Sequence, residues 1–334
     1  MSGRGCEPEP DAFHPVSTRL VPRFAGTPTF LRLPQHADPS DVDVMICGVP
    51  FDGGTTFRPG ARFGPRGVRN ASALTRGYHP AQGVDLFRAL RCCDGGDVLS
   101  VPMQLTETLD RIEQRVSDIV TAGATPVLVG GDHTISIGAL RALAKHHGPL
   151  AMLHFDAHSD TFGPAWGVDL HHGSVFRKAL EEGLLRTRDV LQVGIRGPFA
   201  SADDLKLAEQ AGFEIRFVDD VKRDLAAVGA ELSAFRTRGP CYVSFDVDAI
   251  DPAYAPGTGT PVPGGLTSYE ALFLVRALTG VQLAGFDLVE ISPDHDVAGI
   301  TTLLGATLLA EVLASLAASS RSTPSAAPDA RRSR

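Results

Sequence analysis

The sequence predicts an α/β fold, a three-layer α/β/α sandwich around one mostly parallel sheet. Short apolar runs alternate with amphipathic segments along the chain, which is the pattern of successive strand–helix units. The apolar runs are nearly continuous, as expected for strands that helices cover on both faces. Polar residues rich in Asp and His follow several runs, and ligands of open parallel sheets gather at that end of the strands.

Eight strands are predicted, at residues 43–49, 90–98, 126–130, 150–155, 190–195, 214–218, 242–245 and 283–289. Seven helices are predicted, at residues 108–121, 135–147, 175–182, 202–210, 224–235, 268–279 and 300–316. Glycines at positions 123 and 148 mark the ends of the first two helices. Because the alternation continues without a linker or a repeat, one sheet is expected to contain all the strands.

The chain is expected to form one domain between two loose ends. Residues 1–21 are predicted to be a flexible arm, residues 22–318 a single domain, and residues 319–334 a disordered tail rich in Ser, Pro, Ala and Arg. Residues 300–318 are the most apolar stretch, but Glu311 and several hydroxyl side chains interrupt it. We therefore expect a buried helix there and no membrane contact.

Composition excludes several classes of protein. The 334 residues are 43% hydrophobic and 21% charged, which describes an ordinary globular protein. With 31 Lys and Arg against 39 Asp and Glu, the net charge is −8 and no basic stripe appears, so nucleic acid is not an expected partner. The five cysteines show no disulfide or zinc-ligand spacing, and no apolar signal core opens the sequence, which favours a cytoplasmic location.

The chain is organised around one motif that follows the predicted strand at residues 150–155. Asp156, His158 and Asp160 stand at every second position, so in an extended chain their side chains point the same way. Converging carboxylates repel one another unless a cation lies between them. The alternative for this stretch alone is a polar strand end with scattered charges.

Two further strand ends extend the set of potential ligands. Asp246 and Asp248 follow a strand-like run with the same spacing, and His133 follows another apolar run. The six candidate ligands are therefore His133, Asp156, His158, Asp160, Asp246 and Asp248. Their number is sufficient for two ions that share bridging carboxylates, and mixed oxygen and imidazole donors suit Mn²⁺, Fe²⁺ or Zn²⁺.

These motifs resemble a known family, the ureohydrolases, which includes the arginases and agmatinases. The resemblance rests on Gly-Gly-Asp-His-Thr at 130–134, Asp-Ala-His-Ser-Asp at 156–160 and Ser-Phe-Asp-Val-Asp at 244–248. Residues 58–65 and 251–261 are similar to the agmatinase branch, and residues 22–30 to its guanidinobutyrase, guanidinopropionase and proclavaminate amidinohydrolase members. The resemblance implies an arginase-like fold for the domain.

The resemblance also implies the chemistry, which is manganese-dependent hydrolysis of a guanidino compound to urea and an amine. It implies two Mn²⁺ per subunit on the six candidate ligands, with Asp156 and Asp246 as bridges. Two cations about 3.5–4 Å apart lower the pKa of water between them and hold hydroxide for attack on the guanidinium carbon. Asp160 is expected to orient this hydroxide, and a homo-oligomer with the segment before Val42 as a contact is expected from the family.

Two further residues are expected to serve the reaction. His172, a His before Gly, matches the family's proton shuttle and suits transfer near pH 7. Glu290 follows the strand at 283–289 and matches the family glutamate that pairs with the substrate guanidinium. The alternatives are a plain loop role for His172, and for its neighbour His171, and a cap or loop role for Glu290.

The tail of the substrate is left open by the sequence. The loop at 161–172 contains Trp166 and Asp169 and no Lys or Arg, which favours an amine tail as in agmatine. Guanidinobutanoate, guanidinopropanoate or a proclavaminate-type guanidino acid becomes the substrate if Arg58, Arg62 or Arg196 reaches the pocket. For the arginines of the 58–66 loop, salt bridges or a subunit contact are the alternative.

Two readings from other classes remain open. A zinc deacetylase on a related scaffold needs a single catalytic metal, so the number of bound ions distinguishes it. A non-catalytic, metal-stabilised binding protein would release no urea from any guanidino compound.

Overall fold

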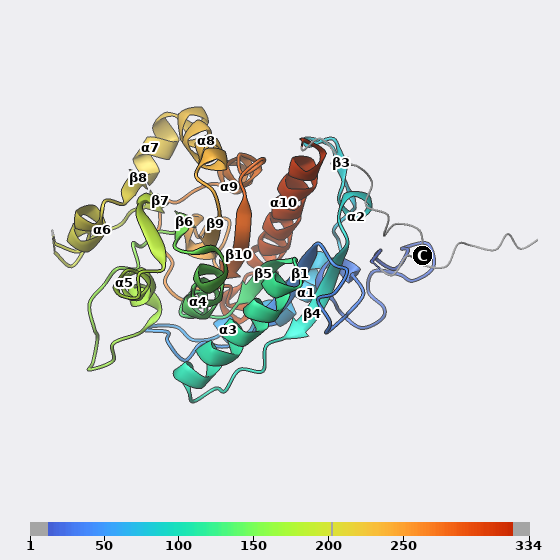
Figure 1. Cartoon of the computed structure of the whole chain (residues 1–334), viewed down its shortest axis with the longest axis horizontal. Helices are drawn as coiled ribbons and strands as arrows, with labels where there is room; N and C mark the ends of the chain where they lie inside the picture. Colours follow the sequence, from blue (N-terminus) through green and yellow to red (C-terminus); the bar gives the residue numbers. More distant parts are fainter. Residues whose placement is uncertain (1–12, 202, 323–334) are drawn as a thin grey trace, which may run out of the picture.

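An eight-stranded sheet forms the centre of the structure, a computed structural model that describes residues 13–201 and 203–322 (Figure 1). The strand order is β4-β1-β5-β10-β9-β6-β7-β8, and every neighbouring pair is parallel. The strands are β1 (Val44–Val49), β4 (Cys92–Asp97), β5 (Thr125–Gly130), β6 (Leu150–Phe155), β7 (Leu185–Ile195), β8 (Glu214–Phe217), β9 (Cys241–Asp246) and β10 (Leu283–Val289). The predicted parallel sheet is therefore confirmed.

Helices cover both faces of the sheet. One face carries α3 (Leu105–Thr121), α4 (Ile135–His147) and α5 (Val175–Glu181), each packed against the next. The other face carries α1 (Gly64–Ser72), α10 (Ile300–Ser322), α9 (Ser268–Arg276) and α8 (Leu225–Ala234). Shorter helices are α2 (Leu86–Ala89), α6 (Lys206–Ala211) and α7 (Val218–Arg223). The arrangement confirms the predicted three-layer sandwich.

Strand β6 shows how the sheet divides the core into two apolar clusters. Leu150 and Met152 face the cluster under α3–α5, whereas Ala151, Leu153 and Phe155 face the cluster under α8–α10. All of these side chains are buried, because each face of a parallel strand packs against helices. This two-sided burial explains the continuous apolar runs in the sequence.

The structure adds elements that the periodicity did not reveal. Helix α1 begins at Gly64, within residues 58–66, which the sequence indicates to be a loop, and has Pro65 in its first turn, where a missing N–H costs nothing. Two-residue strands β2 (Tyr78–His79) and β3 (Val84–Asp85) form an antiparallel hairpin. Helix α6 begins at Lys206, later than predicted, and position 202, where it was expected to start, lies outside the described residues.

The predicted disordered tail begins too early. Helix α10 continues to Ser322, so the prediction is wrong for residues 319–322, whereas 323–334 lie outside the described residues. The Ser319 hydroxyl accepts a hydrogen bond from the Gly280 N–H (2.7 Å) and donates to the Ser315 carbonyl, which ties this polar turn to the core. Of the predicted arm, residues 1–12 also lie outside the described part, and residues 13–21 form turns and irregular chain.

Helix α10 is long and apolar enough to cross a membrane by length and composition. However, 72% of its most apolar window is buried inside the protein, against the sheet and its neighbouring helices. Burial in the core therefore accounts for its composition, as expected from the sequence.

Four central strands, β5, β10, β9 and β6, place their carboxyl ends side by side. The loops after β5 and β10 are joined by a hydrogen bond from the Glu290 N–H to the Gly131 carbonyl (2.8 Å). Gly131 has a φ of +40°, and a Cβ there would lie 2.4 Å from the Phe51 carbonyl oxygen. Only glycine therefore allows the loop after β5 to pass this close to the loop after β1.

Candidate active site

The six predicted metal ligands converge at the carboxyl edge of the central strands. His133 lies just beyond β5, and Asp156, His158 and Asp160 lie beyond β6. Asp246 ends β9, and Asp248 follows it within a 3₁₀ turn, Val247–Ala249. All except His158 are buried, and His158 is partly exposed. The structure thus brings together residues that are up to 115 positions apart, since Asp248 lies 248 − 133 = 115 residues after His133.

One group of ligands surrounds the His133 ring. Its Nδ1 lies 2.8 Å from an Asp160 oxygen, 3.3 Å from Asp156 and 3.4 Å from Asp246. This nitrogen is buried, yet none of the three oxygens is aligned for a hydrogen bond with it. Close approach without hydrogen-bond alignment is what several ligands of one cation would show.

The second group surrounds His158. Its Nδ1 lies 3.1 Å from an Asp248 oxygen and 3.3 Å from the second oxygen of Asp156. Asp156 therefore contacts both groups, with Oδ2 facing His133 and Oδ1 facing His158. This placement fits the bridging role that the family resemblance implies for Asp156.

Neighbouring groups hold His133 in the form that a metal requires. Its Nε2 lies 2.7 Å from the Ser244 hydroxyl, which itself donates to Asp287 (2.6 Å). Because the Ser244 proton is committed to Asp287, the hydroxyl accepts the Nε2–H of His133. The lone pair is then on Nδ1, directed at the carboxylates, as in metal-bound histidines whose other nitrogen is hydrogen-bonded.

The pKa values of the cluster show a deficit of positive charge. Burial raises the pKa of Asp246, and the charges of Asp248 and Asp156 raise it further. Burial lowers the pKa of His158, but Asp248 and Asp156 outweigh it and raise the pKa to about 12. The carboxylates thus attract protons onto the histidines, and a divalent cation can replace those protons. The donor set therefore fits divalent metal ions.

Glu290 and His172 form a pair beside this cluster. The Glu290 Oε1 accepts from the His133 N–H (2.9 Å) and contacts the His172 Nδ1 (2.9 Å). The other oxygen, Oε2, is buried and has no hydrogen-bond partner among the described residues. A buried carboxylate oxygen in this state is a site for a cationic donor such as a guanidinium.

Two of these residues have a strained backbone. Asp160 has a φ of +52° and Glu290 a φ of +64°, in the left-handed region that non-glycine residues seldom adopt. Such strain costs on the order of 1–3 kcal/mol and persists where the surrounding structure imposes it, commonly at functional sites. Among the described residues, five further non-glycine residues with positive φ lie outside this pair, so the strain is consistent with a catalytic role of Asp160 and Glu290 and does not by itself indicate one.

The ionisation of His172 is controlled by acidic neighbours. Burial lowers its pKa, but Glu290, Asp160 and Asp132 outweigh this effect and raise the pKa to about 9. Asp132 was not a predicted ligand, and its buried carboxylate accepts from the N–H groups of Gly54 and Thr134. Near neutral pH, His172 therefore carries a proton that it can donate.

Trp166 and Asp169, predicted to line the substrate mouth, lie outside the buried cluster. Trp166 is 80% exposed at the tip of its loop. The Asp169 carboxylate pairs with Arg177 (3.0 Å) and Lys178 (3.3 Å) of helix α5. Because these cations already balance the charge of Asp169, the argument for an amine tail is weakened, and the substrate roles of both residues stay predictions.

The three arginines in question have different surroundings. Arg62 pairs with the buried Asp52. Arg196 is buried and donates to main-chain carbonyls of the loop that carries Asp248, including those of Asp248 and Ala249. Arg58 makes no ion pair with a described residue and lies over the Phe57 ring. Its carbonyl oxygen would lie 2.8 Å from a Cβ on Gly259. Among the three, Arg58 therefore remains available to an anion.

Sequence reasoning missed a layer of residues behind the ligands. The buried His154 contacts Asp156 through Nε2 (2.8 Å), and its Nδ1 faces the Gln192 amide nitrogen (2.9 Å). Phe176 of α5 packs against the rings of both His154 and His133. The alternation of side chains along a strand could have predicted that His154 lies on the same face as Asp156, because it precedes Asp156 by two positions. Nothing local indicated Gln192 or Phe176.

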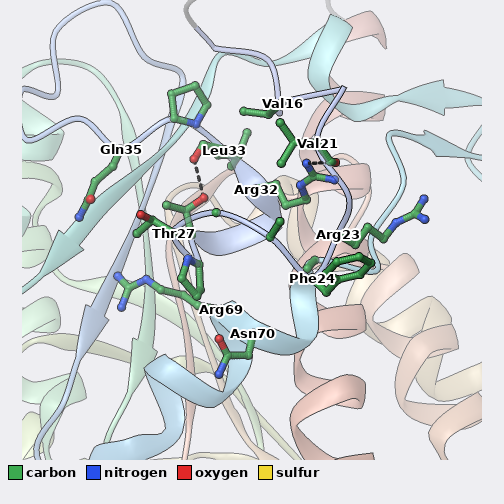
Figure 2. Close-up of a pocket in the computed structure, with 16 residues that line it drawn as sticks. Val16, Val21, Arg23, Phe24, Thr27, Arg32, Leu33, Gln35, Arg69 and Asn70 are labelled. Atoms are coloured by element: carbon green, nitrogen blue, oxygen red, sulfur yellow. Dashed lines mark hydrogen bonds between the residues drawn. The ribbon is translucent and has the colours of Figure 1, made fainter. Parts of the chain in front are cut away.

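A cavity of about 550 Å³ lies apart from the predicted site, between the N-terminal segment and α1 (Figure 2). Figure 2 shows Arg69 and Asn70 of α1 facing Thr27 and Leu33 across it. The Arg69 guanidinium already pairs with Asp94 (2.8 Å), so it offers no free charge to a substrate. Phe24 beside the cavity is 93% exposed, and contact of this segment with another subunit stays a prediction.

The donor set at this edge of the sheet fits divalent metal ions, and comparison with known proteins identifies the family to which the chain belongs. Residues 42–315 match the model of the Arginase family, and the chain belongs to that family. The predicted ureohydrolase assignment, and with it the agmatinase-like branch, is confirmed.

Among individual proteins, the chain is 47% identical to guanidinopropionase of Pseudomonas aeruginosa, over 91% of this chain and 96% of the relative. It is 41% identical to mitochondrial agmatinase of Gallus gallus, over 90% of this chain and 88% of that protein. The solved structure of proclavaminate amidinohydrolase from Streptomyces clavuligerus superimposes with a TM-score of 0.84 at 41% identity, covering 89% of this chain and 99% of the other. The chain is thus a hydrolase of guanidino compounds.

Proposed function

We propose that this protein hydrolyses a guanidino acid to urea and an amino acid, with two Mn²⁺ bound per subunit. The observation that carries the proposal is the buried His/Asp cluster beside a glutamate with one unpaired oxygen. Guanidinopropionase, at 47% identity, and the human guanidino acid hydrolase, at 43%, support an acid substrate. The neutralised Asp169 and the unpaired Arg58 support it too.

The residues of this chain divide the reaction between them. His133, Asp156 and Asp160 would hold one ion together with Asp246, which lies 3.4 Å from the His133 Nδ1, and Asp156, His158 and Asp248 would hold the other. His154 lies within the first group as well, where its Nε2 contacts Asp156. When bound, such ions supply hydroxide at neutral pH by lowering the pKa of water. Glu290 would bind the guanidinium through its free Oε2, holding the guanidinium carbon beside the nucleophile.

Two side chains would then handle protons. Asp160, close to His133, would accept a hydrogen bond from the nucleophile and orient it. Collapse of the tetrahedral intermediate breaks the bond from carbon to the tail nitrogen, which leaves as an amine only if it gains a proton. The protonated His172 would give that proton, because its acidic neighbours keep it charged near pH 7.

A urea-release assay across a panel of substrates tests the proposal. With purified protein and added Mn²⁺, we expect 3-guanidinopropanoate or 4-guanidinobutanoate to give a kcat/KM at least about 100-fold above those of agmatine and arginine. A tenfold change in kcat/KM corresponds to about 1.4 kcal/mol, so a 100-fold preference corresponds to about 2.8 kcal/mol. One wrongly paired charge on the substrate tail is sufficient to produce a difference of this size. Elemental analysis should find two Mn²⁺ per subunit.

Agmatine is the second candidate, supported by the 41% identity to an agmatinase. A preference for agmatine in the panel would contradict the proposal of a guanidino acid substrate. It would support the prediction that Asp169 binds the amine tail. One ion per subunit with no urea from any compound would contradict the proposal and favour the deacetylase alternative.

Replacement of His172 by Ala should slow turnover without removing metal. Loss of a general acid typically costs about 10²–10⁴-fold in rate, so kcat should fall by roughly that factor. His172 contacts Glu290 and Thr56 and none of the six predicted ligands in the hydrogen bonds it makes, so metal content should be unchanged. The alkaline limb of the wild-type rate profile, where His172 loses its proton, should also disappear. A variant with the wild-type rate would remove His172 from the mechanism.

A further inference from the structure

Thr56 contacts the ring nitrogen of His172 that does not face Glu290. The Thr56 hydroxyl lies 2.5 Å from the His172 Nε2, and the Thr56 N–H donates to the same nitrogen at 3.1 Å. The Nδ1 of the ring lies 2.9 Å from Glu290. Both nitrogens are therefore occupied, one by a carboxylate and one by a threonine.

The two groups of Thr56 differ in what they can do for Nε2. A main-chain N–H only donates, so it favours an Nε2 without a proton and hence a neutral ring. A hydroxyl both donates and accepts, so it can bond Nε2 before and after the ring loses its proton. Only the hydroxyl can stabilise an Nε2–H at this position.

Hydrogen bonds tie the loop that carries Thr56 to His172 and Asp132. The His172 N–H donates to the Gly54 carbonyl (3.0 Å), and the Gly54 N–H donates to the buried Asp132 (2.6 Å). A Cβ at Gly54 would lie 2.4 Å from the Thr134 side chain, so the loop packs closely against the residues after β5. These contacts place the Thr56 hydroxyl at Nε2 before any substrate binds.

We propose that Thr56 is a positioning residue whose hydroxyl keeps His172 protonated and correctly oriented for the leaving amine. This inference rests on the function proposed above. In the charged ring, Nε2–H donates to the hydroxyl and Nδ1–H to Glu290. After the Nε2 proton passes to the leaving nitrogen, the neutral ring keeps its Nδ1–H on Glu290 and its Nε2 accepts from the Thr56 hydroxyl, and a proton from water then returns to Nε2.

The other groups around His172 also favour its protonated form. Glu290 faces it from the end of β10, Asp132 from the loop after β5, and Asp160 from the loop after β6, and all three are acidic. They favour the charged ring through their negative charge, whereas the Thr56 hydroxyl does so by accepting a hydrogen bond. Loss of the hydroxyl therefore leaves the three carboxylates in place, and its effect can be measured separately.

Thr56→Val and Thr56→Ser separate the hydroxyl from the shape of the side chain. In Thr56→Val, only the N–H faces Nε2, so the pKa of His172 should fall. The reaction needs the protonated ring, so the alkaline limb of kcat should move to lower pH by roughly one unit, equivalent to about 1.4 kcal/mol. KM should change less than twofold, and Thr56→Ser should restore the wild-type profile.

Thr55→Val is the matched control. Thr55 is the preceding residue in the same loop, and its buried hydroxyl has no hydrogen-bond partner among the described residues. The same chemical change there should leave the alkaline limb in place. Equal limbs in wild type and Thr56→Val, or a Thr56→Ser profile like that of Thr56→Val, would overturn the proposal.

A second readout does not depend on activity. In protein labelled with ¹³C-histidine and loaded with diamagnetic Zn²⁺ in place of Mn²⁺, the His172 signal, assigned by its loss in His172→Ala, should titrate at lower pH in Thr56→Val than in wild type. If no substrate releases urea but the His172 titration still shifts, the proposed function is refuted and the effect of Thr56 on His172 is retained. Urea release with no shift would refute the role of Thr56 and keep the proposed function.

Discussion

Asp246→Asn is expected to remove most of the bound metal and nearly all urea release. Asp246 lies 3.4 Å from the His133 Nδ1 and has a pKa raised by burial and by the charges of Asp248 and Asp156. Its charge is therefore maintained only if a cation balances it. Since loss of an outer partner alone costs 10–100-fold in metal affinity, we expect Mn²⁺ to bind at least about 100-fold more weakly.

The loss of kcat in Asp246→Asn should exceed the loss that weaker Mn²⁺ binding explains. Correctly placed metal ions stabilise the charge of the transition state by several kcal/mol. Because Asp246→Asn alters the ligands of the ion, kcat should fall by roughly 10³-fold even at saturating Mn²⁺. Equilibrium dialysis with elemental analysis measures the metal, and urea release measures the rate. Asn keeps the oxygen that accepts from the Asp248 N–H (2.8 Å), so the fold of this loop should be retained.

Asp110→Asn on the exposed side of α3 is the charge-matched control, and it should keep both ions and full activity. Unchanged metal content in Asp246→Asn would contradict the role of Asp246 as a metal ligand. Thermal unfolding of both variants with excess EDTA compares their metal-free stabilities and so separates metal loss from misfolding.

Glu290→Gln should give the second large effect, on kcat/KM. Gln has the same shape but no charge, so the free position at Oε2 can no longer form an ion pair with a guanidinium. Truncating one partner of a buried charge pair costs about 2–5 kcal/mol, so kcat/KM should fall by roughly 30- to 5000-fold. Metal content should remain at the wild-type level, because Glu290 contacts the main-chain N–H of His133 rather than its ring.

Glu209→Gln, on the exposed surface of α6, controls for the loss of one negative charge and should behave like wild type. A Glu290→Gln enzyme with an unaltered kcat/KM would exclude Glu290 from substrate binding. Guanidinium chloride at low millimolar concentration should inhibit the wild type competitively and Glu290→Gln much less, which provides a binding readout independent of turnover.

The spacing of Asp156, His158 and Asp160 predicted a cluster after one strand, but the extended chain assumed for it is absent, because residues 157–158 form a bend and Asp160 has a φ of +52°. The same spacing predicted Asp246 and Asp248 after another strand, where Val247–Ala249 forms a 3₁₀ helix instead. Turns, rather than alternation along a strand, direct these side chains toward one another. Continuous apolar runs predicted the two-sided burial that Leu150 to Phe155 show. The burial pattern depends on local periodicity, which a sequence contains directly.

Helix α1 and Asp169 show where local reasoning failed. Glycine and arginine in the stretch before α1 indicated a loop, but packing of α1 on α10 stabilises a helix there. Asp169 looked like a free carboxylate because its partners, Arg177 and Lys178, lie on α5 beyond the loop that was considered. In both cases a contact from another part of the chain decided the outcome.

The sequence by itself determined the class of fold and the six donor side chains as candidates, because these depend on residue type and spacing, and the family resemblance marked His172 and Glu290 as separate candidates. Only the tertiary structure placed His172 and Glu290 in contact. Tertiary structure alone decided that β10 lies between β5 and β9, which places Glu290 beside His133. It also decided that Thr56 meets His172 across 116 positions. Contacts between distant segments follow from how strands are ordered in the sheet, and no local pattern contains that order.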